Sequence, residues 1–285
     1  MIAGTRFRLT AEINRQVSLG RDIARTQVEI ATGKRILAPS DDPSGAAIVS
    51  ELTRVKAEEA AWISNLKVAG TLSDRAENAL TSVASNIDRV TELMVAAGSD
   101  TLSAENRASI ALELRSIAAD IVATSNTRDP RGGDLFSAGA ALPIPVNAGN
   151  NVIAVASRDE VFGNIATAGG PMDLAAIINE AADAITLADP VARRAATEES
   201  IAAVAAAHEH IAAARADQGV RGNRIERIRE QLEESAVRLD EQKGGIEGVD
   251  LTEAIARLQS KQLSLQAAQA VLARVSQSSL FDLLR

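Results

Sequence analysis

Apolar residues recur between Ile48 and Ala97 with the spacing of a coiled-coil seam. Steps of four and three residues alternate through this stretch without interruption, which is the heptad pattern of a helix packed along one face. Of the fifteen seam positions, only Glu59 and Ser73 are polar. The pattern therefore predicts one long helix with a buried face.

Residues at the two ends of this stretch set the bounds of the helix. Asp42 is a good N-cap, Pro43 fits the first helical position, and Gly98 follows the last apolar position. We therefore expect the helix to span residues 43–97.

Three shorter or interrupted stripes predict further helices. They cover residues 103–128, from Met172 to about Leu187, and from Pro190 to about Lys243. Between the first two, residues 131–172 are rich in Gly, Ala and Asn and contain short strand-like runs. We expect a small hairpin region there, with too little apolar mass to fold alone.

The last of these helices carries two stripes that are slightly out of phase. One lies in residues 201–211 and includes His208 as a packed position, and the other lies in residues 225–239. Gly219 and Gly222 fall between them. They predict a close helix contact or a shift of register at this point.

The two ends of the chain carry similar amphipathic patterns. Each predicts an assembly helix whose apolar seam is interrupted by glutamine, a residue that weakens packing but can determine partner choice. The expected interface residues are Leu9, Ile13, Val17, Ala24, Leu251, Ile255, Leu258, Leu265, Leu272 and Phe281. Amphipathic helices at both ends are typical of a subunit that assembles with other chains.

The segment after the first helix has the residues of a structural linker. Gly33 is suited to end a helix, and Pro39 and Pro43 limit the backbone on either side of a pair of aspartates. Asp41 and Asp42 are candidates for a cation site or for acid–base chemistry. A helix cap directly before Pro43 is the favoured interpretation.

The predicted fold is predominantly all-α: an elongated rod of long helices in coiled-coil-like packing, with a small β-hairpin region in the middle. The expected segments are an N-terminal assembly helix and linker (1–42), N-terminal rod helices (43–130), a β and loop region (131–172), C-terminal rod helices (173–245) and a C-terminal assembly helix (246–285).

Composition and charge exclude several functional classes. Aromatic residues make up only 2% of the chain, which suits narrow helical layers better than a thick enzyme core. The absence of cysteine excludes disulfides and thiolate sites. The net charge of −8 disfavours nucleic acid as a partner, although residues 1–35 carry +4. The sequence predicts no membrane insertion and no cleaved signal peptide.

Residues for catalysis or cofactor binding are not apparent. His208 and His210 are the only histidines, and their spacing of two puts them on different faces of a helix. Phosphate-binding glycine motifs are absent as well. We therefore expect no enzymatic activity, no cofactor and no metal site.

Several segments carry a family resemblance. Residues 31–49, ATGKRILAPSDDPSGAAIV, resemble the N-terminal signature of the flagellin and hook-associated protein family, and the form PSDDP is most similar to that of its hook–filament junction members. Residues 87–93 and Asn106-Arg107 are similar to the family's helical body. Residues 126–139 resemble a segment of the junction members that ends in an aromatic-Leu-Phe-Ser-Gly motif, although Asp134 replaces the aromatic residue. At the far end, VDLTEAIARLQ and SLFDLL within residues 249–284 resemble the C-terminal helix.

The resemblance implies a structural subunit of the bacterial flagellum that joins hook to filament through its terminal helices. The implied partners are further copies in a ring or filament layer, the hook-side junction protein, flagellin, an export chaperone and the flagellar secretion apparatus. The implied location is extracellular, after export without cleavage. Junction members have a larger outer β-domain than residues 131–172 allow, so a short flagellin remains an alternative. A signalling coiled coil is an alternative of another class.

Overall fold

The computed structural model describes residues 2–99, 101–129 and 131–283, and most of them are helical. The helices are α1 (Ile2–Thr32), α2 (Pro43–Ala97), α3 (Ala104–Ser125), α4 (Arg158–Phe162), α5 (Leu174–Ala184), α6 (Pro190–Glu247) and α7 (Leu251–Leu283). The strands form two separate antiparallel hairpins, β1 (Pro143–Asn147) with β2 (Asn150–Ile153), and β3 (Ile165–Thr167) with β4 (Gly170–Met172). The predicted fold, all-α with a small hairpin region, is confirmed.

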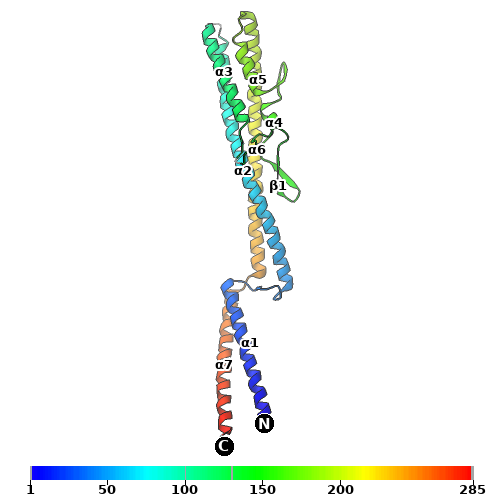
Figure 1. Ribbon diagram of the computed structural model, residues 1–285, viewed down its shortest axis with the longest axis vertical. Coiled ribbons are helices and arrows are strands. Elements are labelled where there is room, and N and C mark those ends of the chain that lie inside the picture. Colours follow the sequence, from blue (N-terminus) through cyan, green and yellow to red (C-terminus); the bar gives the residue numbers. More distant parts are fainter. Residues whose placement is uncertain (1, 100, 130, 284–285) are drawn as a thin grey trace. The chain divides into compact units, whose positions relative to one another are not determined.

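The chain divides into two compact units. One consists of residues 58–235, and the other combines residues 1–57 with residues 236–285. We call them the core unit and the terminal unit. Helices α2 and α6 contribute residues to both units (Figure 1).

The long helix α2 has the predicted bounds and the predicted buried face. It begins at Pro43 and ends at Ala97, directly before Gly98. From Leu66 to Ala97 every seam position is buried, whereas Ile48 at the start of the seam is exposed. The heptad pattern thus identifies the core of the unit, but that core does not extend to the start of the helix.

Helix α6 has one continuous seam, which corrects two predictions. The seam passes through Ala207, which is buried, while the neighbouring His208 is exposed and pairs with Asp88. With Ala207 in place of His208, the two predicted stripes are in phase and no shift of register is needed. The expected close contact occurs at Gly222, where an added Cβ would lie 3.2 Å from Ser73 Oγ.

The segment between α3 and α5 belongs to the core unit and contributes to its apolar core. Phe136 is fully buried and meets Phe162 edge to face, with ring centroids 5.0 Å apart. Helix α4, which the sequence analysis missed, begins with a capping box formed by Ser157 and Glu160. His210 Nε2 lies 3.1 Å from the carbonyl oxygens of Glu160 and Val161, and so holds this short helix against α6.

Candidate assembly interface

Helices α1 and α7 pack against each other in the terminal unit (Figure 1). The residues of α7 that lose exposure recur in steps of four and three: Ala254, Leu258, Lys261, Leu265, Ala268 and Leu272. On α1 the same spacing holds for Glu12, Gln16, Leu19, Ile23, Thr26 and Ile30, and Gly20 and Glu29 lose exposure beside them. The pairing face is therefore mixed, because polar side chains occupy a large share of its positions.

The predicted seam of α1 lies one position away from the observed pairing face, whereas the predicted seam of α7 coincides with it in part. Leu258, Leu265 and Leu272 lie on the pairing face of α7, where they are half-buried. The other predicted interface residues with described side chains are exposed: Ile13, Val17, Ala24, Leu251 and Ile255. The side chains of Leu9 and Phe281 lie outside the described residues.

The terminal unit leaves many of its large apolar side chains exposed and the others only half-buried. In the part of the chain that the structure describes, Ala254 is the single buried hydrophobic residue of this unit. On the outer face of α7, Leu263 and Val271 are 68% and 56% exposed, and Phe7 of α1 is also exposed. Burial of apolar surface is the main favourable term in folding and association, so this unit has surface available for association.

The linker between α1 and α2 is attached to the end of α6. Arg35 N–H donates to the carbonyl oxygen of Glu247 over 2.6 Å, and Val249 N–H donates to that of Gly33 over 3.0 Å. Gly33 has a φ of 68°, a conformation that favours glycine. The chain thus closes a contact between segments more than 200 residues apart, which no local pattern predicts.

The two adjacent aspartates of the linker have different roles. Asp42 caps α2 by accepting from Gly45 N–H over 2.9 Å and from the Ser44 hydroxyl, as the sequence predicts. Asp41 accepts from the N–H groups of Leu37 and Ala38 over 3.0 Å each and shapes the linker itself.

The same hydrogen bonds change the acidity of both carboxyls. The Ala38 and Leu37 N–H groups, and then Arg25, hold the pKa of Asp41 below its usual value. The Gly45 N–H, the Ser44 hydroxyl and Arg35 do the same for the pKa of Asp42.

The turn before α2 also requires a glycine at position 45, which the sequence analysis did not single out. It is buried in the first turn of α2, and an added Cβ would lie 2.6 Å from Asp42 Oδ2 and 2.8 Å from Ile36 Cδ1. Any side chain here would displace the capping carboxylate. Pro39, by contrast, is exposed.

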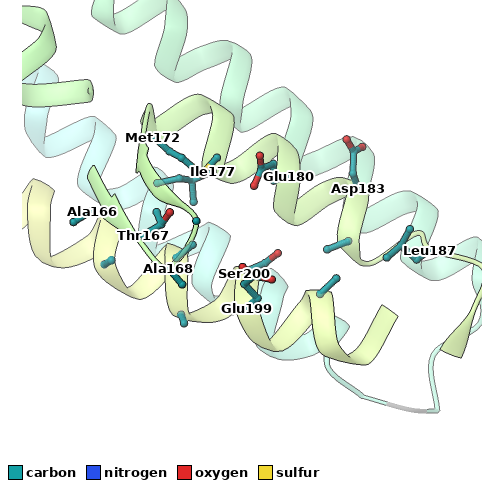
Figure 2. A pocket seen from close by; sticks show the side chains of 16 residues that line it. Ala166, Thr167, Ala168, Met172, Ile177, Glu180, Asp183, Leu187, Glu199 and Ser200 are labelled. Carbon is teal, nitrogen blue, oxygen red and sulfur yellow. The ribbon is translucent and has the colours of Figure 1, made fainter. Parts of the chain in front are cut away.

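The described residues lack a cluster of metal-ligating side chains and a membrane-spanning helix. No three His, Cys, Asp or Glu side chains among them are placed to hold a metal ion. None of their helices is long and apolar enough to cross a membrane. The hollow shown in Figure 2 has a volume of about 470 Å³ and lies between the β3–β4 hairpin, α5 and α6, with Glu180 and Glu199 beside it and alanines along α6.

Two family models match the chain. The N-terminal helical region of bacterial flagellin matches residues 12–140, and the C-terminal helical region of bacterial flagellin matches residues 201–284. Together they cover about three quarters of the chain.

Curated relatives match over a shorter stretch. Flagellar hook-associated protein 3 of Salmonella typhimurium is 31% identical over 109 residues, which are 38% of this chain and 34% of that protein. The protein of the same name from Escherichia coli is 29% identical over 109 residues. The chain thus spans about a third of the length of the curated relatives it matches.

Solved structures show the same fold at low identity. FlgL of Xanthomonas campestris matches with a TM-score of 0.59 and 16% identity, over 69% of this chain and 99% of that one. The flagellar junction protein FlgL of Legionella pneumophila matches with a TM-score of 0.55 and 12% identity, over 72% of this chain and all of that one.

Proposed function

The chain belongs to the bacterial flagellin family, and from this membership we propose that it is a structural subunit of the flagellum that joins hook to filament. The names of the curated relatives support the junction role over that of the filament itself. The PSDDP form of the linker, residues 39–43, supports it as well.

One structural observation carries the proposal: the terminal unit has almost no apolar core of its own. A helix pair with one buried alanine gains little from folding alone, because isolated helices are marginal in water. Neighbouring subunits would bury the exposed apolar faces of α1 and α7. At about 25 cal/mol per Å² of apolar surface, each fully buried leucine would contribute roughly 2 kcal/mol.

This role assigns a structural part of the subunit to each range of residues. Residues 1–42 and 246–285 are the assembly segments, residues 43–130 and 173–245 are the rod helices, and residues 131–172 form the outer region. In this scheme Ile13, Val17, Leu251 and Ile255 face neighbouring copies, because their side chains are close to half exposed.

The proposal includes the partners of the subunit and its route of export. The subunit assembles with further copies in a ring or layer, between a hook-side junction protein and flagellin. It reaches the cell exterior through the flagellar secretion apparatus, with an export chaperone and without cleavage of a signal peptide. The mechanism is mechanical and needs neither a cofactor nor an enzymatic step.

A deletion strain tests the proposal. Loss of a junction subunit leaves hooks without filaments while flagellin accumulates in the medium, and the intact gene supplied in trans restores the filaments. Loss of a short flagellin also leaves hooks bare, but then the medium lacks this chain and no other flagellin accumulates. Normal filaments in the deletion strain would exclude both roles.

A further inference from the structure

A chain of alternating charges connects α7, α1 and the linker within the terminal unit. Arg257 Nη2 lies 3.8 Å from Glu29 Oε2, and Arg25 Nε donates to Glu29 Oε1 over 3.2 Å. Arg25 Nη2 in turn lies 2.6 Å from Asp41 Oδ1. Two guanidinium groups thus contact Glu29 and Asp41 across three segments, and Arg257 Nη1 also lies 3.7 Å from Glu253 Oε1 of its own helix.

The carboxylates of this chain are largely withdrawn from water. The side chains of Glu29 and Asp41 are 11% and 14% exposed, whereas those of Arg25 and Arg257 are about half exposed. A carboxylate in such a position is favourable only while it keeps its partners. Without Arg257, Glu29 and Asp41 would share one guanidinium.

Asp41 connects these ion pairs to the backbone of the linker. Its second oxygen, Oδ2, accepts from Leu37 N–H and Ala38 N–H, which are in the linker. The neighbouring Asp42 takes no part, because its oxygens cap α2 and meet Arg35. Of the two aspartates, Asp41 is therefore the one that connects the linker to Arg25 of α1 and, through Glu29, to Arg257 of α7.

We propose that Arg257, Glu29, Arg25 and Asp41 form an ionic latch, with Arg25 as the positioning residue, that couples the linker conformation to the pairing of α1 with α7. When the helices separate, Glu29 loses Arg257 and competes with Asp41 for Arg25. The turn at Leu37 and Ala38 then loosens. The latch is a property of this chain and does not rest on the flagellar role.

Hydrogen exchange of the Leu37 and Ala38 amides in the full chain tests the latch. Arg257 is distant in sequence from these amides, and a merely structural role in α7 would not change their exchange. In Arg257→Gln and Arg25→Gln, loss of a charge-assisted contact should raise the exchange rate about ten-fold. Arg257→Lys keeps the charge and should restore most of the protection.

Lys261→Gln is the matched control. Lys261 Nζ donates to Thr26 Oγ1 over 3.3 Å, so it joins α7 to α1 without belonging to the latch. Its replacement should leave the Leu37 and Ala38 amides near their parent rates. The proposal is overturned if these amides exchange in the parent as in an unstructured peptide, if Arg257→Gln leaves them unchanged, or if Lys261→Gln accelerates them equally.

Discussion

Gln218 and Ser73 form a polar layer inside the apolar seam of the core unit. Gln218 is 3% exposed, and its Nε2 donates to Ser73 Oγ over 2.8 Å and to the carbonyl oxygen of Ala154 over 2.9 Å. The layer thus joins α2, α6 and the segment that follows β2. A polar pair at a seam position defines the register of two helices, because any shift leaves it unsatisfied.

Replacing Gln218 with Leu should destabilise the core unit. The change leaves the Ala154 carbonyl and the Ser73 hydroxyl buried without their donor, at a cost of about 1–3 kcal/mol. Denaturant melts of Gln218→Leu, Ser73→Ala and the double variant measure the coupling between the two residues. Strictly additive effects would show that the layer does not act as a unit.

A charge placed in the α2 seam should unfold the core unit. Ile87 is 1% exposed, and Ile87→Asp combines a lost apolar side chain with an unpaired buried carboxylate. We expect the cooperative thermal transition to be lost at 37 °C. Ser85→Asp, at an exposed position two residues earlier, should melt close to the parent temperature.

Polar substitutions on the outer face of α7 should separate assembly from stability. Leu263→Ser with Val271→Ser removes exposed apolar side chains, so the melting temperature of the purified chain should stay unchanged. Filament number should fall sharply in cells, because intermolecular burial is lost in every subunit. Gln266→Ser, an exposed position on the same helix, serves as the control. Unchanged filament counts in the double variant would exclude this face from assembly.

Acid should release the linker only at low pH. The pKa values of Asp41 and Asp42 are lower in the folded chain than the value near 3.9 of an unfolded aspartate. Their contribution to stability is therefore fully present above about pH 5, and it is lost as the pH falls through the folded values. Amide exchange at Ala38 and Gly45 measured from pH 7 downward checks this. Asp41→Asn should remove the pH dependence of the protection factor, the ratio of intrinsic to observed exchange rate, at Ala38 but not at Gly45.

Much of the helical pattern was predictable because its signals are local. The cap at Asp42, the heptads of α2 and the stop before Gly98 each depend on residues within a few positions of one another. The phase of α6 was misjudged at His208 because residues 202–207 consist of alanine and one valine, so several faces have equal hydrophobicity. Only burial in the tertiary structure distinguishes Ala207 from its neighbours.

The terminal helices also show that local sequence does not determine which face of a helix is buried. The sequence indicated amphipathic helices for association at both ends. The apolar stripe of α1 does not coincide with its pairing face, and that of α7 coincides only at Leu258, Leu265 and Leu272. Glu29 and Thr26 are buried in this pair and carried no local signal. Their burial depends on Arg257 and Lys261, which are more than 220 residues away.

The sequence by itself determined the longer helices, the cap at Asp42 and the hairpin segment, because periodicity and capping act over three or four residues. Its motifs indicated the family. The tertiary structure decided which face of α1 meets α7, and that Asp41 joins α1 while Asp42 caps α2. Such choices depend on partners distant in the chain, and the competing faces differ little in apolar content. A small difference in contact energy therefore selects between them, and it exists only once the segments meet.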